Sequence, residues 1–177
     1  MKRPNATLIA VAAIMIAVTT VFTMIVRVPI PATQGYVNFS DLATYFAAFA
    51  FGPLIGGVAG GVGAAIADLL SGYAQFALLT LLAHGSQGVA AGWLGRGKGL
   101  KGLIVAWAAG TLCMVGVYFL GEWLVLGMGV GAALAEAPFN LLQNVVGGVV
   151  GIPLLYAVRR AYPPIARLGQ KDTWQEE

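Results

Sequence analysis

Charged side chains are scarce in this sequence. Only 10% of its 177 residues are Asp, Glu, Lys or Arg, whereas 59% are hydrophobic, and the mean hydropathy is +0.83. A soluble globular domain carries roughly 25% charged residues, so this composition excludes that class and indicates a polytopic membrane protein. The net charge of +3 is confined to the ends of apolar segments, and we expect no nucleic-acid partner.

Cysteine and histidine are equally rare, with one of each, Cys113 and His84. One cysteine excludes a disulfide within the chain, and one histidine with one cysteine makes no convincing metal cluster. The glycine-rich turn at 95–99 lacks the Lys-Ser/Thr ending of a phosphate-binding loop, and neither HExxH nor GxSxG occurs. The sequence therefore predicts no catalytic site, no metal and no cofactor.

Long apolar runs fill most of the chain, and they leave no loop long enough for a soluble domain. We expect an all-α membrane protein with six transmembrane helices in a single integral membrane domain, residues 1–177. The first run is too long for the core of a signal peptide, so we expect it to be retained. The second helix is short because Gly52 and Pro53 interrupt it. The expected helices cover residues 6–26, 40–52, 53–70, 75–94, 102–126 and 137–157.

The distribution of basic residues predicts the orientation, because cytoplasmic loops are enriched in Lys and Arg. With six spans, Arg27 is the only basic residue expected on one side of the membrane, and all the others fall on the opposite side. Both termini are therefore expected to be cytoplasmic, and Asp41, Asp68, Glu122 and Glu136 are expected near the outer face. The basic residues on the other side are Lys2, Arg3, Arg96, Lys98, Lys101, Arg159, Arg160, Arg167 and Lys171.

Polar side chains recur at helical spacing in the outer halves of the last three helices. Amides in hydrocarbon are costly unless they are hydrogen-bonded, so these faces bind either a polar ligand or one another. Glu122 has a further alternative. Because it is near a helix end, its side chain could simply lie in the lipid headgroup layer. The first loop supplies residues that could close over a site. The candidate ligand-binding residues are Thr80, His84, Gln87, Tyr118, Glu122, Asn140, Gln143, Asn144, Tyr36, Asn38 and Tyr73.

A stripe of small residues follows one face of the first helix, at Ala6, Ala10, Ala13 and Ala17. Such a stripe lets another helix approach closely. The partner is either a helix of this chain or a separate membrane subunit.

The segment from Asn38 to Tyr73 carries a family pattern. Asn38 and Asp41 precede the second helix, an FGP turn (Phe51 to Pro53) follows, and a glycine-rich helix ends in ADLLSGY (Ala67 to Tyr73). This pattern resembles the substrate-binding S components of energy-coupling factor (ECF) vitamin transporters, in the riboflavin-type group. The six-span layout extends the resemblance over nearly the whole chain.

The resemblance implies a division of labour within an S-component-like bundle in a prokaryotic plasma membrane. The alanine stripe would dock on a shared transmembrane subunit coupled to two ATPases, and helices 4 to 6 with the first loop would hold a vitamin or precursor near the outer face. Riboflavin, the thiamin pyrimidine precursor and pyridoxine belong to this ligand class. Many members of the group have a lysine and an acidic residue where this chain has His84 and Gln87. A pocket of His, Gln, Asn and Glu favours a neutral or weakly basic heterocycle.

Two other functions remain open from the sequence. A self-sufficient carrier or channel would transport without a partner ATPase. A structural scaffold protein would use its buried amides only to join helices, and their loss would affect stability without any ligand phenotype.

Overall fold

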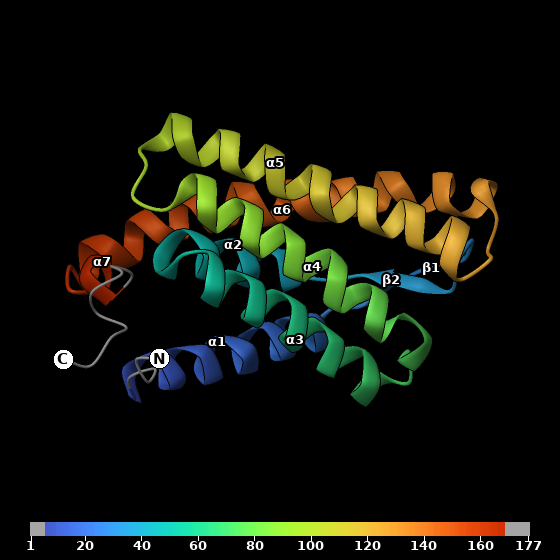
Figure 1. The fold of residues 1–177 in the computed structure, drawn as a ribbon, viewed down its shortest axis with the longest axis horizontal. Coiled ribbons are helices and arrows are strands. Elements are labelled where there is room, and N and C mark those ends of the chain that lie inside the picture. Colours follow the sequence, from blue (N-terminus) through green and yellow to red (C-terminus); the bar gives the residue numbers. More distant parts are fainter. Residues whose placement is uncertain (1–5, 169–177) are drawn as a thin grey trace, which may run out of the picture.

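The computed structural model describes residues 6–168 and shows a bundle of long helices with one short β-hairpin (Figure 1). The basic residues Lys2, Arg3 and Lys171, which contribute to the expected orientation, lie outside the described residues. The strands are β1 (Val28–Ile30) and β2 (Gly35–Val37). The helices are α1 (Ala6–Ile25), α2 (Ser40–Phe51), α3 (Pro53–Ser71), α4 (Ala74–Gly95), α5 (Leu100–Leu120), the π-helix η1 (Gly121–Val125), α6 (Val130–Ala161) and α7 (Ile165–Leu168).

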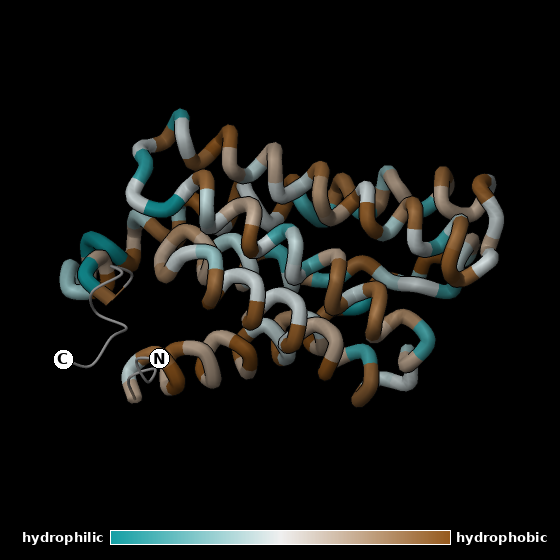
Figure 2. Tube along the Cα trace, in the orientation of Figure 1, coloured by the Kyte–Doolittle hydropathy of each residue, from teal (hydrophilic) through white to brown (hydrophobic). Residues whose placement is uncertain are grey.

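The two ends of the bundle differ in what they carry. The hairpin, the α3–α4 turn and the start of α6 lie at one end, and the α4–α5 loop and α7 lie at the other (Figure 1). Hydrophobic residues predominate along the helices between these ends (Figure 2). Four helical stretches are long and apolar enough to cross a membrane: α1, α3, α6 and the continuous stretch formed by α5 and η1.

The short helix α2 occupies the interior of the bundle. At 12 residues it is about 18 Å long, which is less than the roughly 30 Å of a hydrocarbon core. Most of its side chains are buried, including Tyr45 and Phe49, whose rings stack with their centroids 5.6 Å apart. Gly52, with φ of 92°, and Pro53 at the first position of α3 turn the chain sharply after α2. The predicted Gly-Pro break is thus confirmed.

Two features of the fold differ from the sequence prediction. Residues 28–37 form an antiparallel hairpin, with Pro29 opposite Tyr36, where only an irregular loop was expected. The last helix begins at Val130 rather than at residue 137, and Pro138 lies inside α6. Transmembrane helices tolerate an internal proline when neighbouring groups satisfy the freed backbone. As a result, Glu136 lies inside a helix and is buried.

Helices α3 and α4 pack through glycines. A Cβ atom at Gly88 would overlap the carbonyl group of Gly56, and one at Gly92 would lie 2.6 Å from the carbonyl carbon of Gly52. The two backbones can approach this closely only because neither glycine has a side chain. This close packing fixes α4, and with it His84, against the interior of the bundle.

Candidate functional site

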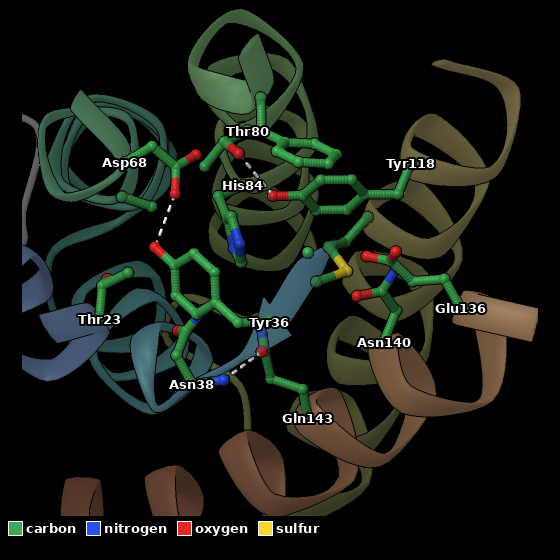
Figure 3. Close-up of a pocket in the computed structure, with 14 residues that line it drawn as sticks. Thr23, Tyr36, Asn38, Asp68, Thr80, His84, Tyr118, Glu136, Asn140 and Gln143 are labelled. Carbon is green, nitrogen blue, oxygen red and sulfur yellow. Dashed lines mark hydrogen bonds between the residues drawn. The ribbon is translucent and has the colours of Figure 1, made fainter. Parts of the chain in front are cut away.

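A narrow polar cavity lies beneath the hairpin, where side chains from several helices converge (Figure 3). Its free volume is about 20 Å³, enough for about one water molecule. Tyr36, Phe76 and Tyr118 give it aromatic walls, and hydroxyl, amide and carboxyl groups face the space between them. The lining residues are Thr23, Gly35, Tyr36, Asn38, Ala64, Asp68, Phe76, Thr80, His84, Met114, Tyr118, Glu136, Asn140 and Gln143.

The hairpin is held over the cavity by side-chain contacts to α3 and α6. The Tyr36 hydroxyl donates a 2.6 Å hydrogen bond to Asp68 Oδ1, and the Asn38 amide N–H donates a 2.7 Å bond to Gln143 Oε1. The Thr33 hydroxyl donates to the carboxylate of Glu136. Burial and the neighbouring Asp68 carboxylate raise the pKa of Tyr36, which keeps its hydroxyl protonated as a donor. These contacts tie residues 33–38 to α3 and α6 at the edge of the bundle.

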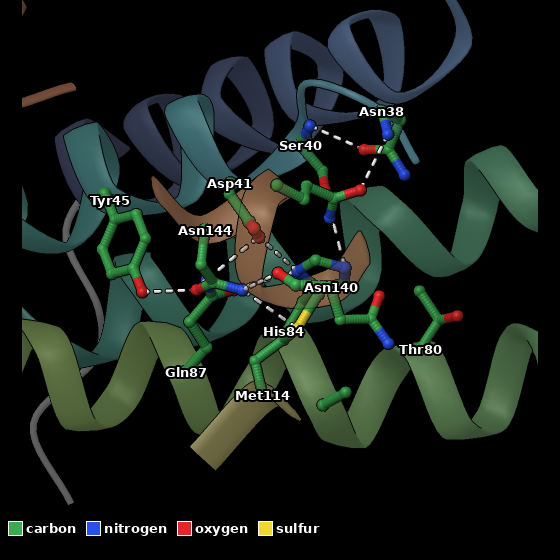
Figure 4. A network of polar contacts seen from close by, with 12 residues as sticks. Asn38, Ser40, Asp41, Tyr45, Thr80, His84, Gln87, Met114, Asn140 and Asn144 are labelled. Carbon is green, nitrogen blue, oxygen red and sulfur yellow. Dashed lines mark hydrogen bonds and ion pairs between the residues drawn. The ribbon is translucent and has the colours of Figure 1, made fainter. Parts of the chain in front are cut away.

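A network of buried polar groups forms the floor of the cavity (Figure 4). His84 Nδ1 lies 2.9 Å from Gln87 Oε1 and 3.1 Å from Asp41 Oδ1. Both neighbours are acceptors, so Nδ1 carries a proton. Nε2 of the same ring lies 3.5 Å from the Ser40 hydroxyl. His84 therefore belongs both to this network and to the wall of the cavity.

Asn144 is the centre of this network and uses all of its hydrogen-bonding capacity. Its Oδ1 accepts from the Tyr45 hydroxyl at 2.6 Å and from Gln87 Nε2 at 2.8 Å. Its Nδ2 donates to the Asn140 carbonyl at 2.9 Å and to Met114 Sδ at 3.1 Å. The side chain is fully buried, so no polar atom of Asn144 remains for a ligand.

The comparisons with known proteins agree with this architecture. Residues 4–160 match the family model described as the S component of the ECF-type riboflavin transporter. The chain belongs to this family. The solved structure of the S component of a bacterial ECF transporter is similar to it, with a TM-score of 0.71 and 26% identity, covering 89% of this chain and 97% of the other.

Further relatives resemble this S component over most of their length. A thiamine precursor transporter, HmpT of Lactococcus lactis, is 33% identical over 161 residues, which are 90% of this chain and 92% of HmpT. An uncharacterized protein of Pyrococcus woesei is 42% identical over 147 residues, 82% of this chain and 97% of that protein. The structure of FolT bound with folic acid shares the fold, with a TM-score of 0.60, 17% identity and coverage of 89% of this chain and 97% of FolT.

The structure brings many of the sequence-predicted site residues of this S component together around the cavity. Four others lie outside its wall. Gln87 and Asn144 belong to the floor network, and Glu122 lies behind Glu136. The ring of Tyr73 packs on the outer side of Tyr36, with centroids 4.6 Å apart. Those that line the cavity are Tyr36, Asn38, Thr80, His84, Tyr118, Asn140 and Gln143.

Acidic side chains are the main part of the site that sequence reasoning left out. Asp68 and Glu136 line the cavity, and Asp41 lies below it in contact with His84. An ionisable residue inside an apolar helix is itself a signal of function, and that signal would have found Asp68. Glu122 is fully buried rather than in the headgroup layer, because η1 turns its side chain inward.

The alanine stripe lies on the outside of this S component. Ala6, Ala10, Ala13 and Ala17 are all exposed along α1. The buried residues of α1 are instead Met15, Thr19 and Thr23, on the opposite face. Packing within the chain therefore does not account for the stripe.

Proposed function

We propose that this S component binds a small heterocyclic vitamin or vitamin precursor in the cavity beneath the hairpin. The observation that carries the proposal is the cavity itself, in which aromatic walls and convergent polar groups are enclosed by the hairpin and by residues of α1, α3, α4, α5 and α6. Ligand sites for small polar rings have this composition. The 33% identity to a thiamine precursor transporter supports a ligand of this class.

The cavity must widen to admit such a ligand, since its free volume is about 20 Å³. The hairpin is the part that moves, because it is held by the Tyr36–Asp68, Thr33–Glu136 and Asn38–Gln143 contacts. A ligand entering from the outer side breaks these bonds and replaces them with its own. The cavity groups then recognise it by its hydrogen-bonding edges, with His84 Nε2, Asn140 and Gln143 as the binding residues in the wall. Gln87 and Asn144 act from below by positioning His84.

The proposed orientation places the hairpin end outside and both termini in the cytoplasm of a prokaryotic cell. The described basic residues other than Arg27 lie in the α4–α5 loop, the start of α5 and the region from the end of α6 through α7. These segments meet at the end of the bundle opposite the hairpin (Figure 1). The positive-inside rule assigns that end to the cytoplasm. The membrane domain then has six spans, with α4 and the buried α2 completing the set of apolar helices.

Transport by this S component is proposed to need partners, namely a shared transmembrane subunit and two ATPase subunits. The exposed stripe of Ala6, Ala10, Ala13 and Ala17 is the proposed docking face. The sequence offers no phosphate-binding loop, so the free energy for uptake would come from the separate ATPases, and the chain itself acts as a binding subunit rather than an enzyme.

Reconstitution in liposomes tests this function. The S component is incorporated alone or with the transmembrane subunit and the ATPases, and uptake of a radiolabelled ligand is measured with and without ATP. We expect binding in both preparations, and uptake only with the complete module and ATP. Uptake by the S component alone would instead identify a self-sufficient carrier.

A further inference from the structure

The cavity carries negative charge that the described side chains do not neutralise. Asp68 and Glu136 line it, and none of the described lining residues is Lys or Arg. His84 is the one basic group in the wall, and it is already paired with Asp41 at 3.1 Å. Arg27, at the same end of the bundle, is exposed. A ligand in this cavity therefore meets an acidic environment in a medium of low dielectric constant, where a positive charge is strongly favoured.

Glu122 adds a second carboxyl group directly behind Glu136. Its side chain is 0% exposed, and neither carboxylate oxygen has a hydrogen-bond partner among the described residues. Glu136 is the charged side chain that acts on Glu122 electrostatically. Two neighbouring carboxylates in a buried site repel each other, and a cation beside them relieves that repulsion. The pair is thus set up to accept either a proton or a positively charged group.

Glu136 is the member of the pair that a ligand can reach. Its carboxylate is covered by the hairpin, through the Thr33 hydroxyl and through Gly35, where an added Cβ would lie 3.1 Å from Oε1. Both covering residues belong to the segment that must lift for entry. Opening the hairpin therefore removes the hydrogen bond from Thr33 and exposes the Glu136 carboxylate to the incoming ligand.

We propose that Glu136, backed by Glu122, binds a basic nitrogen group of the ligand, so that this S component prefers an aminated heterocycle over a neutral flavin or an anionic vitamin. A 4-aminopyrimidine places an amino group beside a ring nitrogen that can be protonated. Those two donors match the two oxygens of a carboxylate in a charge-assisted pair. The rings of Tyr36, Phe76 and Tyr118 enclose the flat faces of such a ligand. This inference rests on the proposed vitamin-binding function and specifies the ligand for the same cavity.

The test is isothermal titration of the purified protein in detergent with three probes. These are 4-amino-5-hydroxymethyl-2-methylpyrimidine, its analogue with an oxo group in place of the 4-amino group, and riboflavin. We expect the amino compound to bind at least about tenfold more tightly than the oxo analogue, since a charge-assisted bond is lost. Glu136→Gln should weaken binding of the amino compound by roughly 10- to 100-fold. Gln75→Ala, at an exposed site outside the cavity, is the control and should bind as the wild type does.

The outcomes separate this inference from the function on which it rests. Equal binding of the amino and oxo compounds by the wild-type protein would overturn the role of Glu136, and this comparison needs no variant. Binding of riboflavin alone would also overturn it, while leaving the vitamin-binding function intact. If neither these probes nor a wider panel of vitamins binds, the proposed function itself fails.

Discussion

His84 Nδ1 lies 3.1 Å from Asp41 Oδ1 in the interior of the helix bundle, and both side chains are at most 2% exposed. The pair joins α4 to α2 directly below the cavity. Gln87 completes it, since its Nε2 donates to the same Asp41 oxygen at 2.9 Å while its Oε1 accepts from His84. The position of the imidazole in the cavity wall thus depends on a carboxylate that does not itself line the cavity.

Asp41→Ala should lower the free energy of unfolding by about 3–5 kcal/mol, because it leaves the buried His84 and Gln87 donors without an acceptor. Asp41→Asn keeps an oxygen at this position and should cost clearly less. Thermal unfolding in detergent measures both variants. Equal unfolding temperatures for Asp41→Ala and the wild type would show that the pair contributes little to stability.

Asn144→Ala and Asn140→Ala should have different effects although the two residues are one helical turn apart. Asn144→Ala removes the acceptor of Tyr45 and Gln87, and we expect a loss of about 1–3 kcal/mol in stability. Asn140→Ala removes a group that faces the cavity, so it should weaken ligand binding with a smaller effect on stability. Unfolding temperature and ligand affinity are measured for each variant. The reverse pattern would mean that the ligand reaches the floor network.

Gly88→Ala should destabilise the bundle by about 1–3 kcal/mol, because the added methyl group would overlap the Gly56 carbonyl across the α3–α4 contact. Gly85→Ala is a matched control on the same helix. There the nearest atoms to an added Cβ are 3.8 Å and 3.9 Å away, so the methyl group fits. Unfolding temperatures of the two variants compare them directly, and equal values would contradict the close packing.

Tyr36→Phe should loosen the hairpin while keeping the aromatic wall of the cavity. The change removes the hydroxyl that donates to Asp68 at 2.6 Å, a bond to a charged group worth about 1.5–3 kcal/mol. We expect faster hydrogen exchange in residues 28–37 and faster ligand dissociation, measured by mass spectrometry and by stopped-flow competition. Tyr73→Phe keeps the ring that packs on Tyr36 and serves as the control. Unchanged exchange in Tyr36→Phe would show that other contacts hold the hairpin.

Ala13→Trp should stop coupled transport and leave ligand binding unchanged, because a large side chain on the alanine stripe prevents close approach of a partner helix. Leu112→Trp, at a 75% exposed position on α5, is the control and should transport normally. Uptake in liposomes containing the complete module measures both. Normal uptake by Ala13→Trp would place the docking face elsewhere.

Helical periodicity was sufficient to predict five of the residues that the helices contribute to the cavity. Thr80, His84 and Tyr118, and also Asn140 and Gln143, were found because polar side chains three or four positions apart share a face. The Gly-Pro break after α2 followed from the conformational limits of those residues. Both features depend on residues that are close together in the sequence, so the spacing of those residues is enough to predict them.

The parts that sequence reasoning missed depend on contacts between distant segments. The course of α2 through the interior, which brings Asp41 to His84, has no local signal. The last helix was expected to begin at residue 137, so Glu136 was not recognised as an inward-facing helical residue. The strands of the hairpin are only three residues long, which is too short for an alternating pattern. Gln87 and Asn144 share the helical faces of the cavity residues but lie deeper. Only the packing of the helices shows that these two residues belong to the floor network and do not line the cavity.

The most direct test of the central claim is a thermal-shift screen of the purified protein against vitamins and their precursors, with Asn140→Ala measured beside the wild type. The account predicts that at least one heterocyclic compound raises the unfolding temperature of the wild-type protein, and that the same compound has a smaller effect on Asn140→Ala. If no compound stabilises the wild type, or if the shift is equal in both proteins, the cavity beneath the hairpin is not the ligand site.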